Sequence, residues 1–129
     1  MKEQSNNRPL SPHLQIYRLP LTAIVSITHR MTGVALVFGM LYLVMWLMGI
    51  AAGPDQFLET QSFLDSILGR LLLFLFSFAL FFHFVHGIRH LFWDAGYTFE
   101  PDQLDRVATL EIIMSICLTL LVWLSRLFV

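Results

Sequence analysis

The stretch MTGVALVFGMLYLVMWLMGIAA, residues 31–52, contains no charged side chain over 22 residues. An α-helix rises about 1.5 Å per residue, so this stretch is long enough to cross the hydrocarbon core of a bilayer, which is roughly 30 Å thick. We expect the helix to begin near Pro20 or Leu21, because a proline fits the first helical turn, where its missing N–H would have no partner anyway. Gly53 and Pro54 are predicted to end it.

Two further apolar stretches follow the first. The eighteen residues between Arg70 and Arg89 carry no charge, and residues 107–125 carry only one charged side chain, Glu111. The prolines all lie outside these stretches or at their edges, which fits unbroken helices that satisfy their own backbone hydrogen bonds in lipid. The sequence therefore predicts an all-α membrane protein of three transmembrane helices. Their expected ranges are residues 21–51, 67–93 and 106–127, after an N-terminal segment of residues 1–20.

The composition supports a membrane location for the chain. Of its 129 residues, 57% are hydrophobic and 13% are charged, against about 25% charged in an ordinary soluble domain. So short a chain has too little interior to bury this much apolar surface away from water. The net charge of -1 gives no indication of a nucleic acid partner, and we predict none. The single cysteine, Cys117, lies in an apolar run and is interpreted as a packing residue.

The distribution of basic residues predicts the orientation in the membrane. Six of the lysines and arginines lie on one side of the membrane, either near the start of the first stretch or around the second connection. The other two lie on the opposite side. Because basic residues concentrate on the inner side of a membrane, we expect the N-terminus in the cytoplasm. The first connection, interpreted as an outer loop, carries three acidic residues. The first twenty residues hold neither an apolar signal core nor an evident transit peptide, which favours the bacterial cytoplasmic membrane over the mitochondrial inner membrane.

Three histidines lie on one face of the second stretch. His83, His86, Gly87 and His90 have helical spacings of i, i+3, i+4 and i+7. Ionisable side chains inside a span usually face a bundle interior or a site. Neutral imidazole is a common axial ligand of b-type haem, and His83, the deepest of the three, is our candidate ligand, with Gly87 leaving room for a flat macrocycle. The alternative is a hydrogen-bonded histidine that bridges helices, which we favour for His86.

The first stretch opens with a second polar face. Ser26 and Arg30 lie one helical turn apart on it. An arginine never loses its charge in practice, so within a span it must reach the interface or pair with an anionic or carbonyl group. A haem propionate and a quinone oxygen are two such groups, and a lipid phosphate is the alternative. Antiparallel packing of the first two spans would bring His29, Arg30 and His90 to a similar depth, where a polar pocket would form.

Two further charged residues lie near the inner ends of their spans. Arg89, together with His90, is expected to meet lipid headgroups or haem propionates. Glu111, in the third stretch, has no evident partner in the sequence, and we expect it to face the surface.

Two long motifs in the chain resemble those of a known family. The stretch RPLSPHLQIY, residues 8–17, followed by SITHRMTG, residues 26–33, is similar to the opening signature of the cytochrome b subunits of succinate dehydrogenase. The pattern H-x3-G-x-R-H-x3-D, from His83 to Asp94, resembles the second signature of the same family. Both motifs occur in the family's order, and the three-span layout covers nearly the whole chain.

The resemblance implies a membrane anchor within a heteromeric helical bundle. A second small membrane subunit would share haem b with this chain, and each would donate one histidine, here His83. His29 and Arg30 match positions near the haem propionates, and Ser26 and Arg30 match positions that line a ubiquinone pocket. An iron–sulfur subunit would deliver electrons that a flavoprotein subunit takes from succinate. The motif leaves the position of His86 open, so the resemblance implies no role for it.

The chain itself is not expected to carry out succinate chemistry, because it has neither a glycine-rich flavin-binding motif nor the cysteines of an iron–sulfur cluster. Two alternatives remain open. One is the anchor of a quinol:fumarate reductase, which runs the reaction in the opposite direction, and the other is a structural anchor without a cofactor. A small transporter or proton pathway is disfavoured, because the sequence shows neither broken helices nor paired half-repeats.

Overall fold

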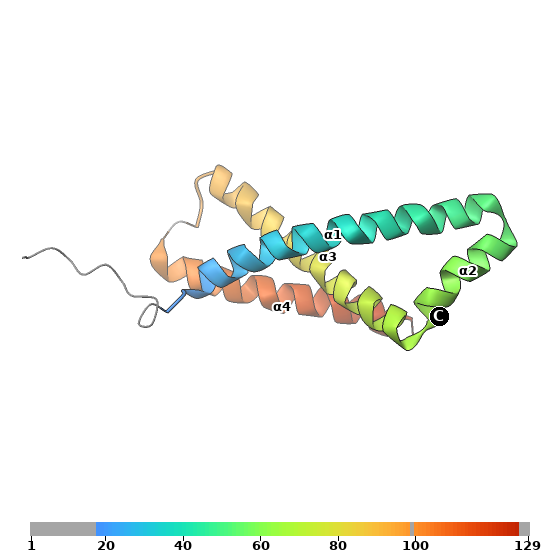
Figure 1. The fold of residues 1–129 in the computed structure, drawn as a ribbon. Coiled ribbons are helices and arrows are strands. Elements are labelled where there is room, and N and C mark those ends of the chain that lie inside the picture. The colour runs from blue at the N-terminus through green and yellow to red at the C-terminus, as the bar shows by residue number, and fades with distance from the viewer. Residues whose placement is uncertain (1–17, 99, 127–129) are drawn as a thin grey trace, which may run out of the picture.

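The computed structural model describes residues 18–98 and 100–126 (Figure 1). This part of the chain contains no strand and forms four helices: α1 (Leu21–Ala52), α2 (Pro54–Asp65), α3 (Ile67–Asp94) and α4 (Pro101–Ser125). α1, α3 and the segment Gln103–Ser125 of α4 are long and apolar enough to cross a membrane. The prediction of an all-α fold with three helices of membrane-spanning length is confirmed.

A glycine and a proline separate α1 from α2. α1 ends at Gly53, whose φ of 122° is a backbone conformation that glycine adopts without the strain a Cβ would bring. The N–H of Gly53 donates to the carbonyl oxygen of Gly49 at 3.3 Å. Pro54 takes the first position of α2, where the absence of an N–H costs no hydrogen bond. The chain therefore turns sharply at this point and starts a new helix at once.

The connection between α1 and α3, interpreted from the sequence as an outer loop, is the helix α2. α2 packs back against the C-terminal half of α1 through two hydrogen bonds. The Tyr42 hydroxyl donates to the carbonyl oxygen of Thr60 at 2.8 Å, and Trp46 Nε1 donates to Gln61 Oε1 at 3.0 Å. Two polar groups on the otherwise apolar C-terminal half of α1 thus find their partners in α2, and these bonds hold the connection against α1.

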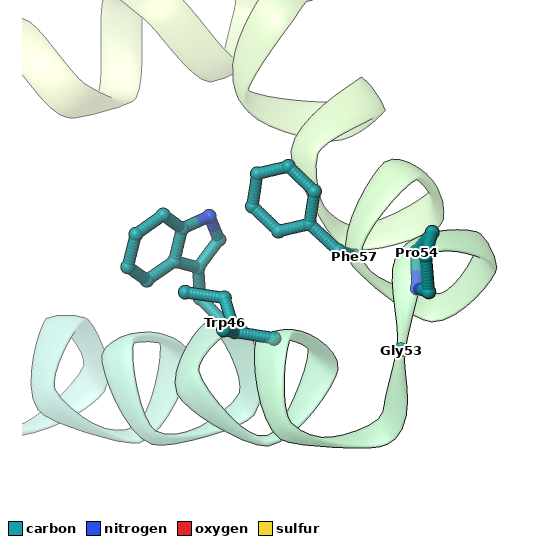
Figure 2. Close-up of a pocket in the computed structure, with 5 residues that line it drawn as sticks. Trp46, Gly53, Pro54 and Phe57 are labelled. Atoms are coloured by element: carbon teal, nitrogen blue, oxygen red, sulfur yellow. The ribbon is translucent and has the colours of Figure 1, made fainter.

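The elbow between α1 and α2 forms an open apolar hollow (Figure 2). The rings of Trp46 and Phe57, which both line it, meet edge to face with their centroids 6.0 Å apart. None of the residues that line the hollow is ionisable, so it offers no group for acid, base or metal chemistry. The lining residues are Trp46, Ile50, Gly53, Pro54 and Phe57.

The buried core lies at the opposite end of α1, where its N-terminal half meets the C-terminal half of α3 and the N-terminal half of α4 (Figure 1). Val25, Phe82 and Ala108 form this core, and each is at most 2% exposed. Away from it α1 and α3 diverge, and most large apolar side chains are exposed, among them Met31 and Phe38. A surface of this kind suits lipid and neighbouring membrane helices.

Gly39 lets α1 lie against the Phe76 ring of α3, because a Cβ at this position would overlap that ring. We expect Gly39→Leu to push the two helices apart and to lower the free energy of unfolding by about 1–3 kcal/mol, the usual cost of overpacking. Thermal unfolding of the purified protein in detergent measures this loss. Phe76→Ala in the same chain should restore part of it, and an unchanged transition for Gly39→Leu alone would contradict the prediction.

Candidate cofactor site

Four histidines from two helices meet beside the core. His29 of α1 contacts all three histidines of the α3 stripe. Its ring stacks on His83, with the centroids 3.9 Å apart and the ring planes at 14°. The ring centroids of His86 and His90 lie 4.4 Å and 5.8 Å from that of His29. The structure therefore brings together His29 and His90, which were expected at a similar depth. His83 and His86 belong to the same cluster.

Hydrogen bonding assigns the tautomer of His83. The Thr32 hydroxyl donates its only proton to the carbonyl oxygen of His29 at 2.8 Å. His83 Nδ1 lies 3.2 Å from that carbonyl oxygen and 3.2 Å from Thr32 Oγ1, so the proton between them has to come from Nδ1. Nε2 of a neutral His83 then carries a lone pair. Gly33 leaves room for this contact, because a Cβ there would lie 3.2 Å from His83 Cε1 and the ring would have to shift slightly.

Glu111 lies inside the helix bundle, so the expectation that it faces the surface was wrong. It is 3% exposed. Its Oε2 accepts a hydrogen bond from His86 Nδ1 at 3.0 Å, and its Oε1 lies 3.1 Å from Arg89 NH1. The physical reason is the packing of α4 against α3, which sets Glu111 opposite two groups that can carry positive charge. A carboxylate excluded from water at this position is stable because it is paired.

Arg89 is also buried, at 3% exposure, so its side chain does not face lipid headgroups, one of the two groups that it was expected to meet beside haem propionates. Besides the contact with Glu111, its NH2 donates to the carbonyl oxygen of Leu104 at 3.1 Å. Its guanidinium carbon lies 4.4 Å from the centroid of the Trp93 ring, a cation–π contact. Arg89 therefore ties the end of α3 to the start of α4.

Ser26 and Arg30 lie at the edge of the cluster. Ser26 is half-buried and Arg30 is exposed, and neither side chain has a polar partner within residues 18–98 and 100–126. Around α1, Ser26 follows the buried Val25 and Arg30 follows His29, each by the 100° that separates successive residues of a helix. The two side chains are thus free to meet a molecule that approaches from outside this chain.

Two imidazole nitrogens in the cluster are buried without a hydrogen-bond partner among the described residues. They are Nε2 of His29 and Nε2 of His86. One nitrogen from each of His29, His86 and His90 lies within 4.8 Å of the others. Buried polar atoms normally have partners, so the orphaned Nε2 of the half-buried His29 marks a place where a group from outside the chain can bind, whereas His86 is 0% exposed and enclosed by this chain.

The α3–α4 contact is the part of the site that the sequence analysis missed. The signal was Glu111 itself, the only charged residue in its apolar stretch. A charge inside a span needs a partner at the same depth in a neighbouring helix, and His86 and Arg89 in the second stretch were the available partners. Pairing ionisable residues between spans would have found this cluster.

Comparison with known proteins confirms the resemblance seen in the motifs. The model of the succinate dehydrogenase/fumarate reductase transmembrane subunit matches residues 4–122. The chain is 44% identical over 115 residues to the succinate dehydrogenase cytochrome b556 subunit of Paracoccus denitrificans, covering 89% of this chain and 88% of that protein. It is 40% identical over 122 residues to the cytochrome b556 subunit of Rickettsia felis, covering 95% of each.

A more distant relative is the succinate dehydrogenase cytochrome b560 subunit of Reclinomonas americana, which is 34% identical over 122 residues, covering 91% of this chain and 85% of that protein. The matches extend across all three long helices and include the histidine cluster. This protein is therefore a membrane protein of the succinate dehydrogenase/fumarate reductase transmembrane subunit family.

Proposed function

We propose that this chain is the cytochrome b subunit that anchors a succinate dehydrogenase in the membrane and forms one side of a haem b site and of a ubiquinone site. The relatives support the anchor role, and the histidine cluster supports the cofactor. Succinate oxidation itself belongs to a flavoprotein subunit, and an iron–sulfur subunit passes the electrons on to this membrane part. The chain has no nucleic acid partner in this scheme.

The observation that carries the proposal is the hydrogen bonding of His83. Because Nδ1 is the donor to the carbonyl oxygen of His29 and to Thr32, Nε2 presents a lone pair, which is the form of imidazole that binds a haem iron. The His83 side chain is half-buried, so a group outside this chain can reach it. A Cβ on Gly87, one turn along α3, would meet nothing within 4 Å, which leaves space for a flat macrocycle.

The donor set of the cluster also fits a haem. When bound, haem b supplies reversible one-electron transfer. His83 would hold the haem iron from this chain, and a second small membrane subunit would donate the other histidine. His29, Arg30 and His90 are proposed to lie near the propionates, because imidazole and guanidinium N–H groups are suitable donors to carboxylates.

Ser26 and Arg30 are proposed to bind ubiquinone. A hydroxyl and a guanidinium directed at one quinone carbonyl stabilise the negative charge that develops on it during reduction. Both residues lie in the N-terminal part of α1, and the proposed cytoplasmic N-terminus puts them on the side where the soluble subunits bind. We assign the complex to the bacterial cytoplasmic membrane, with the mitochondrial inner membrane as the alternative.

Arg30→Ala is expected to lower the rate of quinone reduction by roughly 100-fold, the scale of one lost donor to a developing oxyanion. The measurement is succinate:quinone reductase activity of the purified complex, compared with succinate oxidation by an artificial electron acceptor that bypasses the quinone site. Arg70→Ala is the matched control, because Arg70 is an exposed arginine at the opposite end of the bundle. Normal quinone reduction by the Arg30 variant would remove Arg30 from the site.

The same purified complex distinguishes the competing functions. A reduced-minus-oxidised absorption spectrum shows a b-type band if haem is bound and none for a purely structural anchor. A quinol:fumarate reductase would reduce fumarate with quinol faster than it reduces quinone with succinate. We expect the b-type band and the faster rate in the direction of succinate oxidation.

A further inference from the structure

His86 has no role in the function proposed above, and yet it is the most completely enclosed ionisable side chain described, with 0% exposure. Its Nδ1 is bonded to Glu111 at 3.0 Å. Glu111 is in turn paired with Arg89, which the Leu104 carbonyl and the Trp93 ring hold in place. Hydrogen bonds to an ionised carboxylate are among the stronger ones in proteins, so the His86 ring cannot turn without losing a strong contact.

The faces of the His86 ring are also occupied. The Phe82 ring lies nearly parallel to it, with centroids 6.0 Å apart and ring planes at 14°. The His29 ring lies 4.4 Å away at 33°, and the His90 ring approaches edge-on at 5.0 Å. The plane of His86 is thus set by α4 through Glu111 and by its neighbours in α3. His29, which comes from α1, packs against a ring that is already fixed.

His29 connects this fixed ring to the proposed haem ligand. It stacks on His83 at 3.9 Å, and its main-chain oxygen lies 3.2 Å from His83 Nδ1. One continuous line of contacts therefore runs from Glu111 through His86 and His29 to His83. Groups behind a metal ligand set its orientation and its basicity, and these in turn affect the redox potential of the metal.

We propose that His86, held by Glu111, is a positioning residue that fixes the plane of His29 and through it the plane of the His83 imidazole. This inference rests on the proposed function, in which His83 binds the haem. It assigns the α3–α4 charge cluster of His86, Arg89 and Glu111 to the cofactor site, although none of the three touches the haem in this scheme. His86 acts on the haem only through the two rings that lie between them.

The test uses His86→Phe in the intact purified complex. Phenylalanine keeps a planar ring in the same space but cannot donate to Glu111. We expect the variant to retain its haem. The ratio of reduced to oxidised haem at a fixed applied potential should change about tenfold, which corresponds to a shift of 59 mV in the midpoint potential of a one-electron couple. The electron paramagnetic resonance spectrum of the oxidised haem, whose g values depend on the planes of the axial imidazoles, should shift with it.

Glu111→Gln is the second variant. Glutamine keeps an oxygen that can accept from His86 Nδ1 but removes the charge. The ratio of reduced to oxidised haem and the g values should therefore move in the same direction as in His86→Phe, by a smaller amount. If His86→Phe yields no assembled complex, Glu111→Gln decides alone. Thr119→Val is the control, because Thr119 is a buried residue of α4 whose hydroxyl bonds only to its own helix, at Ser115, among the described residues.

Each outcome decides the inference. If His86 only fills space, the ratio of reduced to oxidised haem and the g values stay at the wild-type values in His86→Phe and in Glu111→Gln. That result overturns the positioning role and leaves the proposed function standing. A wild-type complex without any b-type haem overturns the proposed function and the positioning role with it. A shift in both variants and none in Thr119→Val supports the line of contacts from α4 to His83.

Discussion

Replacing His83 with alanine will remove the b-type haem from the purified complex. Loss of a residue that merely supports a metal ligand already costs about 10–100-fold in metal affinity, so loss of the ligand itself should exceed the upper end of that range. The measurement is the reduced-minus-oxidised absorption spectrum, normalised to the flavin content of the complex. The same variant also removes the ring on which His29 stacks.

Two companion variants show whether the effect is specific. Leu75→Ala lies in the same helix on an exposed position and should keep the full b-type band. Thr32→Val removes the hydroxyl beside His83 Nδ1 but leaves the main-chain oxygen of His29 as an acceptor, so haem should remain bound. An unchanged spectrum for His83→Ala would exclude His83 as the ligand, because the haem would then be held by other residues.

Replacing Glu111 with alanine will destabilise the protein strongly. The change leaves the Arg89 guanidinium, which is 3% exposed, without its only carboxylate partner among the described residues, and leaves His86 Nδ1 without an acceptor. Removing one member of a buried ion pair typically costs about 3–5 kcal/mol. We expect a lower midpoint of thermal unfolding in detergent and a smaller yield of assembled complex.

A double variant separates the loss of pairing from the loss of packing. Arg89→Met with Glu111→Leu replaces the pair by apolar side chains, and such replacements are often neutral in stability, so the double variant should be more stable than Glu111→Ala. His86 still lacks an acceptor in it, which keeps the recovery partial. A wild-type unfolding midpoint for Glu111→Ala would show that the pairing of α3 with α4 does not depend on this carboxylate.

The helices of this protein were predictable because their signals are local. An uncharged run such as residues 31–52 is recognisable from composition alone, and a glycine–proline pair such as Gly53 and Pro54 ends a helix wherever it occurs. The connection was less predictable. The segment of α2 was interpreted as an outer loop between two spans, whereas it is a helix that bonds to Tyr42 and Trp46 of the preceding helix.

The candidate site divides in the same way. The stripe of His83, His86 and His90 follows from helical spacing, and a common depth for His29 and His90 follows from two antiparallel spans. The misplacement of Glu111 and Arg89 came from treating each charge separately. Within one span a charge has no local partner, and the sequence does not state which faces of α3 and α4 will meet.

By itself, the sequence determined that the chain forms three long apolar helices, that histidines line one face of the second, and which family the chain belongs to. These are properties of residues near one another in the chain or of their order along it. Only the tertiary structure decided that Glu111 pairs with His86 and Arg89, that His29 stacks on His83, and that His83 donates from Nδ1. Those contacts join different helices, and helix rotation and depth set them through packing that no single helix contains.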